Sequence, residues 1–235
     1  MEAMLLANQA KLRTAEQLKN ERLLLPNLPL SLVAKQSHQR AHVEQYIAEH
    51  FYSYYQAQVD SFLPYILATH YENQISSALG FHPAYKGERL FLEQYLDGDI
   101  QSTLGQLFHR SVAREDVVEI GNLTSSKKGS SHILFILTAA ILYEAGFKWV
   151  VFTATKQVET LLTKLGLTPV CVCEADPARL SDHGRSWGSY YDKKPKVLAG
   201  NLVDAIPTLY THPVIGGLLQ SYQNTIVKVA MQVKP

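Results

Sequence analysis

A short polar loop between an apolar strand and an apolar helix is the part of this sequence best suited to bind an anion. Val117–Leu123 has the composition of a strand, Thr124–Ser131 (TSSKKGSS) that of a loop, and Ser131–Ala145 that of a helix. The first N–H groups of a helix lack partners within it, and the helix dipole adds partial positive charge at the same end. The pattern predicts a pyrophosphate site. Its residues would be Lys127, Lys128, Gly129, Ser130 and Ser131.

The loop differs from two common phosphate-binding motifs. It contains neither the G-x-x-x-x-G-K-[S/T] pattern of nucleoside-triphosphate loops nor the G-x-G-x-x-G pattern of dinucleotide sites. What remains is a looser loop, of the kind that holds the pyrophosphate of coenzyme A. The alternative interpretation is an exposed turn that carries two surface lysines.

Glu119 is the residue whose chemistry would act on such a ligand. On the predicted strand it shares a face with Val117, Gly121 and Leu123, so its carboxyl group would lie on a mostly buried sheet. Burial raises a carboxyl pKa, and such a group can accept the proton that an amine loses as it attacks a thioester. A backbone N–H of the strand would hold the thioester carbonyl. We predict Glu119 as the general base, with a carboxylate paired to an arginine at a strand edge as the alternative.

Glu93 is the second candidate for a catalytic carboxylate. Arg89–Leu96 is predicted to be a strand, on which Glu93 shares a face with Phe91 and Tyr95. Aromatic residues further along the chain favour an acyl or acceptor pocket, although aromatic side chains in a loop also close hydrophobic cores. The predicted substrate-lining residues are Tyr95, Trp187, Tyr190 and Tyr191. A second aromatic cluster, predicted mainly to pack in the core and alternatively to line the substrate site, consists of Phe51, Tyr52, Tyr54 and Tyr55.

Two other chemistries are not predicted. The histidines show no metal-ligand spacing, so we expect no metal site. The serines of the loop lack the G-x-S-x-G context of a hydrolase nucleophile. Cys171 and Cys173 are interpreted as reduced thiols in the core, because their spacing suits neither a disulfide framework nor a complete zinc site.

The elements that position these residues form an alternating succession. Trp149–Thr153 and Thr168–Cys173 are predicted strands, and Lys156–Leu165 is a predicted amphipathic helix closed by Gly166. With the preceding strand and helix they give a β-α-β-α-β order, which predicts neighbouring parallel strands. Lys196–Leu202 is one further predicted strand. Residues 176–196 follow no periodicity and are interpreted as an ordered functional loop.

The remaining segments complete an α/β domain. Leu30–Ala34 is a predicted strand, Gln39–Gln58 a predicted helix, and Phe62–Tyr71 with Gln74–Phe81 a predicted hairpin that turns at Glu72-Asn73. Residues 1–29 are predicted to be an N-terminal arm, residues 30–202 the main domain, and residues 203–235 an extension that forms a helix or an arm.

Composition narrows the classes of function. The 235 residues include 22 Lys and Arg against 21 Asp and Glu, so there is no basic field that would favour nucleic acid. The longest apolar run, Ile133–Tyr143, is about half of the ~20 residues that span a bilayer, so we expect a buried helix and no transmembrane segment. Met1–Asn20 lacks the pattern of a secretory signal. We therefore expect a cytoplasmic protein.

The residues from Val117 to Leu167 (VVEIGNLTSSKKGSSHILFILTAAILYEAGFKWVVFTATKQVETLLTKLGL) resemble the core of the N-acyltransferase (GNAT-type) superfamily. Within it, the E-I-G-N strand and WVVFTATKQVETLLTKLGL are similar to the acyl-homoserine-lactone synthase branch. From about Leu30 to Leu202, including FLPYILATHYENQISSALGFHPAYKGERLFLEQYLD and SWGSYYDKKPKVLAGN, the chain resembles the thermostable hemolysin family. The resemblance implies a GNAT-like α/β fold, with a mixed central sheet flanked by helices.

The resemblance also implies a ligand and its contacts. The superfamily loop follows a Gln/Arg-x-x-Gly-x-Gly/Ala pattern, to which Gly129 and Ser131 correspond, while Ser126 replaces the leading Gln/Arg. In the lactone synthases an Arg follows the strand Glu by three residues, where this chain has Asn122, so a homoserine lactone is not the predicted product. The donor thioester would lie along the strand and loop, and the strand residues that contact it would be Ile120, Gly121, Asn122 and Leu123.

Two functions remain open at this point. The first is an acyltransferase that moves an acyl group from an acyl-CoA or acyl-carrier-protein thioester to a small-molecule amine, without a metal. The alternative is a membrane-active hemolysin without acyl transfer, which would need an exposed apolar or amphipathic surface. The sequence leaves the acyl length, the acceptor and the oligomeric state undetermined.

Overall fold

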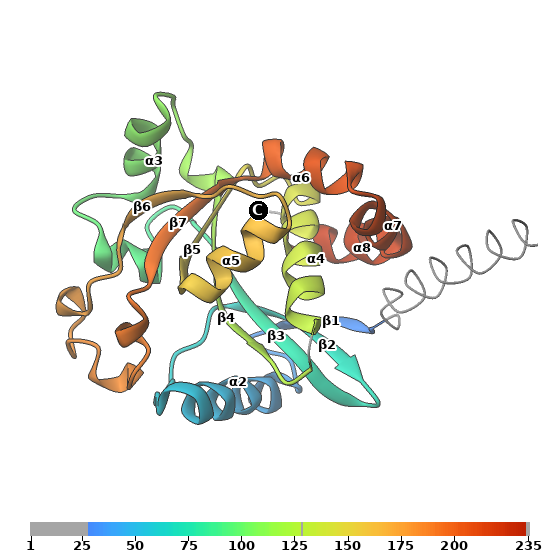
Figure 1. Cartoon of the computed structure of the whole chain (residues 1–235), viewed down its shortest axis with the longest axis horizontal. Coiled ribbons are helices and arrows are strands. Elements are labelled where there is room, and N and C mark those ends of the chain that lie inside the picture. Colours follow the sequence, from blue (N-terminus) through green and yellow to red (C-terminus); the bar gives the residue numbers. More distant parts are fainter. Residues whose placement is uncertain (1–27, 128, 234–235) are drawn as a thin grey trace, which may run out of the picture.

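One mixed sheet forms the centre of the molecule, whose computed structural model describes residues 28–127 and 129–233. The sheet has the strand order β1-β2-β3-β4-β5-β7-β6 (Figure 1). Every neighbouring pair is antiparallel except β4 and β5, which run parallel. The strands are β1 (Leu30–Ala34), β2 (Tyr65–Tyr71), β3 (Gln74–Pro83), β4 (Val117–Ser125), β5 (Trp149–Ala154), β6 (Val170–Glu174) and β7 (Lys196–Asn201). The predicted arm at residues 1–29 lies outside the described residues, except for residues 28 and 29.

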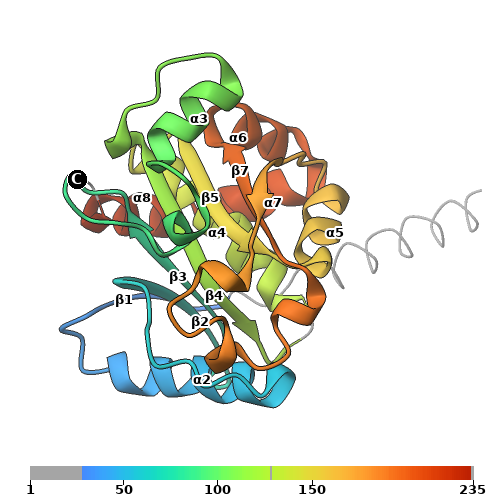
Figure 2. The same ribbon diagram turned by 90° about the vertical axis from the view of Figure 1, so that its left-hand side faces the viewer.

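Helices cover both faces of this sheet (Figures 1 and 2). The α-helices are α2 (Arg40–Tyr55), α3 (Ile100–Phe108), α4 (Ser130–Glu144), α5 (Lys156–Lys164), α6 (Leu202–Thr211), α7 (Pro213–Ser221) and α8 (Gln223–Val233). The 3-10 helices are η1 (Phe91–Tyr95), η2 (Arg114–Asp116), η3 (Pro177–Arg179), η4 (Arg185–Trp187) and η5 (Tyr191–Lys193). One face packs against α4 and its neighbours, and the other against α2, α3 and η1. The predicted α/β architecture with a mixed sheet is confirmed.

Helix α4 is the centre of the larger hydrophobic core. It begins after Gly129, whose φ of 90° suits glycine, and ends before Gly146, whose φ is 101°. Its residues are apolar around almost the whole circumference, because it lies between the sheet and the helices α6 and α8. The prediction of a buried helix at Ile133–Tyr143 is confirmed. Within residues 28–127 and 129–233, no helix combines the length and apolarity needed to cross a bilayer.

The C-terminal segment, predicted to be a helix or an arm, forms the three helices α6, α7 and α8. Apolar side chains from all three join the cluster around α4. Tyr222, between α7 and α8, donates its hydroxyl to the Leu28 carbonyl at 3.0 Å and accepts the Leu28 N–H at 2.6 Å. This segment is thus packed against the rest of the described chain, and the domain boundary at residue 202 stays a prediction.

Two predictions about strands are wrong. Arg89–Leu96 forms no strand, because β3 and β4 pair directly and leave no position between them; it contains the helix η1. The strands β5 and β6 are not neighbours, because β7 lies between them and is antiparallel to both. The predicted hairpin of β2 and β3 is confirmed, with Glu72 and Asn73 at φ values of 49° and 63°.

The two cysteines lie on β6, at the edge of the sheet. Both are free thiols, but Cys171 is exposed and Cys173 is half-buried, so their predicted place in the core is wrong. An edge strand has one unpaired side and is less covered than a central strand. The sequence spacing carried no information about which strand would form the edge.

The segment between β6 and β7, residues 175–195, folds against the C-terminal end of α2 (Figure 2). The N–H of Ser189 donates to the Tyr55 carbonyl at 2.8 Å, and the N–H of Gln58 donates to the Ser186 carbonyl at 2.6 Å. Gly188, between these contacts, has a φ of 53°. A Cβ atom at Gly188 would lie 2.0 Å from the Tyr55 carbonyl oxygen. The close approach of the two backbones therefore requires glycine.

Replacing Gly188 with alanine is expected to separate this segment from α2. The new methyl group meets backbone atoms that cannot rotate away, so unfolding free energy should fall by roughly 2–4 kcal/mol. Denaturant unfolding measures the change. Gly217→Ala is the matched control, because Gly217 lies in α7 with open space around its Cβ position. The Gly217→Ala control should leave the free energy of unfolding unchanged or raise it by up to about 1 kcal/mol. An equal loss in both variants would contradict the conclusion that the backbone contact at Gly188 requires glycine.

Candidate active site

The strands β4 and β5 separate in the middle of the sheet. Their parallel pairing covers Val117–Ile120 and Trp149–Phe152, although β4 continues to Ser125 and β5 to Ala154. Opposite β3, the pairs Gly80–Gly121 and Ala78–Thr124 leave two residues of β4 facing one of β3, which is a β-bulge. Asn122, at φ 54°, forms this bulge. The bulge bends β4 away from β5 and opens the sheet.

The bulge also corrects one predicted contact. Val117 and Glu119 lie on the face of the sheet that packs against η1, as predicted. Leu123 was predicted on the same face, but it packs with the cluster around α4 on the opposite face. The extra residue in β4 reverses the alternation of side chains after Gly121.

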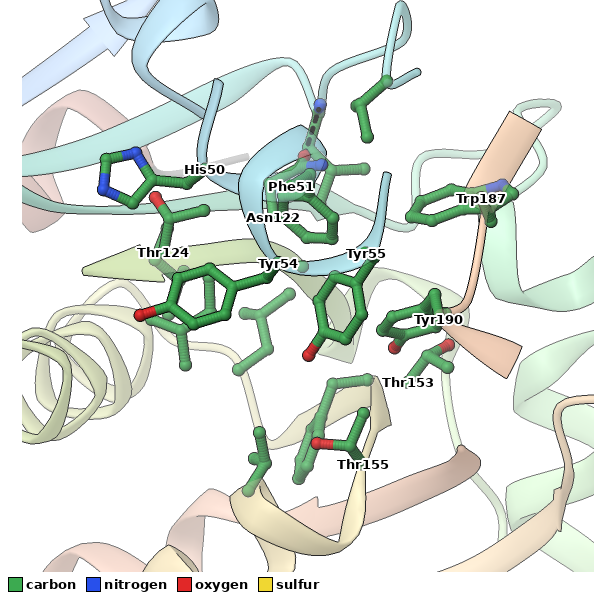
Figure 3. Close-up of a pocket in the computed structure, with 18 of the residues that line it drawn as sticks. His50, Phe51, Tyr54, Tyr55, Asn122, Thr124, Thr153, Thr155, Trp187 and Tyr190 are labelled. Atoms are coloured by element: carbon green, nitrogen blue, oxygen red, sulfur yellow. Dashed lines mark hydrogen bonds between the residues drawn. The ribbon is translucent and has the colours of Figure 1, made fainter. Parts of the chain in front are cut away.

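A cavity of about 1170 Å³ occupies the opening between the strands (Figure 3). It is lined by the bulge and end of β4, the end of β5, the loop before α4, α5, the C-terminal end of α2 with the following loop, and residues 180–191. The predicted residues that line it are Tyr95, Glu119, Ile120, Gly121, Asn122, Leu123, Lys127, Gly129, Ser131, Trp187, Tyr190 and Tyr191. Tertiary structure thus brings most of the predicted residues together.

Two threonines mark polar positions in the cavity wall. The hydroxyl oxygens of Thr124 on β4 and Thr153 on β5 are buried and have no hydrogen-bond partner within the described structure. Buried hydroxyl groups nearly always have partners, so these two are available to a ligand or water in the cavity. Both residues line the cavity (Figure 3). No sequence pattern could have identified these two threonines, because their lack of partners follows from the separation of the strands.

Glu119 lies in the cavity wall with only 4% of its surface exposed. Burial raises the pKa of its carboxyl group to about 8, against the opposing effect of two backbone donors. These donors are the N–H groups of Phe91 and Leu92 in η1, at 2.8 Å from Oε2 and 3.1 Å from Oε1. The carboxyl group is therefore held in one orientation and titrates near neutral pH, as a general base requires.

Glu93 has a different environment, although it lies only a few residues from the donors of Glu119. Its carboxylate forms a bidentate ion pair with Arg114, at 2.7 and 2.9 Å, and accepts the N–H groups of Leu90 and Ile100 at 2.8 Å. Burial acts to raise its pKa, but the hydrogen bonds from Arg114, Ile100 and Leu90 outweigh burial and lower the pKa. Glu93 does not line the cavity. This geometry favours a positioning role, since the ion pair fixes the helix η1 whose amides hold Glu119.

Some of the predicted anion-binding residues in the loop before α4 line the cavity, and one does not. Gly129 and Ser131 line the cavity at the helix N-terminus. Lys127 also lines it, and its ammonium group lies over the ring of Tyr71. Ser130 is buried away from the cavity, and its hydroxyl bonds to the carbonyl oxygens of Lys127 and Ser76 at 2.7 and 3.0 Å. Ser130 thus stabilises the loop conformation, and Lys128 lies outside the described residues.

Aromatic side chains from three segments form one end of the cavity. The ring centroid of Tyr190 lies 5.3 Å from that of Tyr55 and 5.4 Å from that of Trp187. The ring centroids of Phe51 and Trp187 are 6.0 Å apart. Phe51, Tyr54 and Tyr55 on α2 line the cavity, which agrees with the alternative interpretation of that cluster. Tyr52, on the other side of the helix, is 54% exposed. The spacing of Phe51, Tyr54 and Tyr55 on one helix face was the signal that could have separated them from Tyr52.

Solved structures with the same fold include acyl-homoserine lactone synthases and an N-acyl amino acid synthase. The AHL synthase LasI has a TM-score of 0.51 and 13% identity, with 75% of this chain and 90% of LasI covered. The CoA-dependent acyl-homoserine lactone synthase BjaI, solved with SAM and isopentyl-CoA, has a TM-score of 0.52 and 7% identity. The match covers 87% of this chain and 100% of BjaI. FeeM, an N-acyl amino acid synthase from uncultured soil microbes, has a TM-score of 0.50 and 8% identity. The match covers 77% of this chain and 96% of FeeM.

These identities establish the fold alone, which is the predicted GNAT-type acyltransferase fold. The chain belongs to the thermostable hemolysin family, whose model matches residues 33–206. The family and the fold predicted from the sequence are therefore both confirmed. A search of curated proteins finds no match.

Replacing Glu93 with glutamine is expected to destabilise the protein and loosen the support of Glu119. The change leaves the Arg114 guanidinium, whose side chain is 15% exposed, without its carboxylate, so unfolding free energy should fall by about 2–4 kcal/mol. Urea unfolding measures the loss. The exposed pair of Lys148 and Asp116, at 2.9 Å, supplies the control: Lys148→Gln should cost less than about 1 kcal/mol. Equal costs in the two variants would contradict this role for Glu93.

Proposed function

We propose that this protein is an acyltransferase that moves an acyl group from an acyl-CoA or acyl-carrier-protein thioester to an amine. The observation that carries the proposal is Glu119, a buried carboxyl group with a pKa of about 8, in the wall of the cavity between β4 and β5. The same cavity extends to the N-terminus of α4, where a helix dipole favours a pyrophosphate. A base and an anion site at opposite ends of one cleft suit a phosphorylated thioester.

The donor would bind along the separated part of β4. Its pyrophosphate would lie at Gly129 and Ser131, with Lys127 and Lys128 contributing charge. Its thioester would lie against Ile120, Gly121, Asn122 and Leu123. From Gly121 onward β4 has left the pairing with β5, so its backbone can bind a ligand. The unpartnered hydroxyls of Thr124 and Thr153 support this placement, because the amide groups of a pantetheine arm need hydrogen-bond partners.

The reaction needs one positioned base. Glu119 in its carboxylate form accepts a proton from the acceptor nitrogen, which attacks the thioester carbonyl. The N–C bond forms, the C–S bond breaks, and the thiolate leaves and takes a proton from solvent. Tyr95, Trp187, Tyr190 and Tyr191 would contact the acceptor, since they line the end of the cavity next to Glu119.

The name of the family describes lysis, so a membrane-active protein without acyl transfer remains the alternative. An N-acyl amine combines an apolar chain with a polar head and is itself amphiphilic. Acyl transfer and lysis are therefore compatible, because the product can act on membranes. The cytoplasmic location and the absence of a metal cofactor stay predictions.

Donor binding tests the proposal directly. Acyl-CoA should raise the melting temperature of the protein in a concentration-dependent way, because a ligand that binds only the native state stabilises it by mass action. Gly129→Asp should weaken this binding at least about tenfold, since it places a negative charge at the predicted pyrophosphate position. Gly129→Asn is the matched control, because asparagine has the same shape without the charge and tolerates the positive φ. Equal affinities for acyl-CoA in these two variants would remove the anion site from α4.

The pH dependence of turnover tests Glu119. Because its raised pKa of about 8 keeps it protonated at neutral pH, kcat/KM should rise with pH and level off above about 8, where the base is ionised. Glu119→Gln should keep donor binding, lower turnover by roughly 10²–10⁴-fold and lose this rise. The control is the melting temperature of the same sample. A folded Glu119→Gln protein with full activity would remove Glu119 as the base and leave that role to solvent.

A further inference from the structure

Charged side chains divide the cavity into two electrostatically different ends. The basic groups lie at the end formed by the loop before α4. Lys164 is close enough to His132 to add to the effect of burial in lowering its pKa. His50 contacts Tyr46, whose hydroxyl accepts the Ser126 N–H at 3.0 Å. Lys127 belongs to the loop itself, so all four basic side chains of the lining lie toward α4.

The acidic groups of the lining are Asp60, Glu119 and Asp182. Glu119 accepts the Phe91 N–H at 2.8 Å, and the ring centroid of Phe91 lies 6.1 Å from that of Tyr95 and 5.7 Å from that of Trp187, so Glu119 lies near these rings. The hydroxyls of Tyr95 and Tyr191 are hydrogen-bonded to each other, and Asp182 accepts the N–H of Ser186, the residue before Trp187, at 2.8 Å. Glu119 and Asp182 are therefore both located at the aromatic end.

Aromatic rings line the cavity at this end, where Figure 3 shows Tyr54, Tyr55 and Tyr190 side by side. Tyr55 and Tyr190 meet edge to face at an interplanar angle of 88°, and Trp187 is tilted by 44° to Tyr190. Ring faces carry negative charge density and attract cations, most strongly when carboxylates lie nearby. None of the described residues that line the cavity is an arginine, and the lysines lie at the other end.

We propose that the acceptor is a cationic amine without a carboxylate group, bound with its charge among these aromatic faces. This inference rests on the proposed acyl transfer and names the class of its second substrate. A carboxylate on the acceptor would face Asp182, and also Glu119 once that group is ionised, and none of the described lining residues is an arginine that could pair with it, so amino acids are disfavoured by repulsion. A cationic amine is attracted by the same groups.

The charge of the acceptor also suits the chemistry of Glu119. The amine arrives as an ammonium ion and transfers one proton to the Glu119 carboxylate, which makes the nitrogen nucleophilic. The neutral nitrogen attacks the thioester, the N–C bond forms and the C–S bond breaks. The nitrogen loses a second proton to solvent and the thiolate gains one, so the reaction releases a neutral amide and a free thiol.

Binding measured without a donor tests the inference, using tryptophan fluorescence, because Trp187 lines the cavity and the second tryptophan, Trp149, does not. The probes share one skeleton: 2-phenylethylamine is a cation, 3-phenylpropionate an anion and phenylalanine mainly a zwitterion at about pH 8.5, where most of Glu119 is ionised. We expect 2-phenylethylamine to bind at least about tenfold more tightly than either of the others. Tyr55→Leu should weaken its binding several-fold, while Tyr55→Phe, which keeps the ring, should not. Tyr52→Leu is the matched control on the same helix, because Tyr52 is exposed and outside the cavity.

Equal or tighter binding of 3-phenylpropionate or phenylalanine, or no binding of 2-phenylethylamine, would overturn the inference. The comparison of the three probes on the unmodified protein decides this even if Tyr55→Leu fails to fold. The result is independent of the donor experiment. Failure of both acyl-CoA and acyl-carrier protein to bind would end the proposed acyl transfer without changing the order of the probes. A reversed order with intact donor binding would end only this inference.

Discussion

The loss of pairing between β4 and β5 after Ile120 and Phe152 is the constraint on which the candidate site depends. Two parallel strands that stayed paired would close the sheet and leave no space for a ligand. The bulge at Asn122 bends β4, and the Asn122 side chain accepts the Leu63 N–H at 3.3 Å, which fixes the loop after α2 over the bulge. The same bend leaves Thr124 and Thr153 without partners. The cavity and the hydroxyl groups that lack partners within the described structure therefore both follow from the bend in β4.

The two buried glutamates, Glu93 and Glu119, show how different surroundings give identical side chains different roles. Glu93 has a guanidinium partner and remains ionised, so it serves as an anchor for η1. Within the described part of the chain, the hydrogen-bond donors of Glu119 are two backbone N–H groups, and burial dominates its titration. Glu93 thus holds η1 in place, and the N–H groups of η1 orient Glu119, which titrates near neutral pH. This arrangement is consistent with the separation of structural and chemical roles found in enzyme sites where neighbouring carboxyls have different pKa values.

The candidate site also depends on contacts between segments that are distant in sequence. Gly188 lets residues 175–195 approach the end of α2, and this contact brings Trp187 and Tyr190 next to Phe51 and Tyr55. The aromatic end of the cavity is a property of this contact and not of any one segment. The basic side chains among the described lining residues lie toward α4, and Asp182 and Glu119 lie toward the aromatic end, so the two ends of the cleft differ in charge once Glu119 is ionised.

The sequence by itself determined the features that arise from local patterns. Alternation and apolar runs predicted β4 and α4, the loop between them and the burial of Glu119, because secondary structure and side-chain direction follow from periodicities of a few residues. Tertiary structure alone decided that Arg89–Leu96 joins no sheet, that β7 separates β5 from β6, and that Glu93 pairs with Arg114. Such outcomes depend on which distant partner gives a strand or a charge the better contact, and local periodicity does not encode that choice.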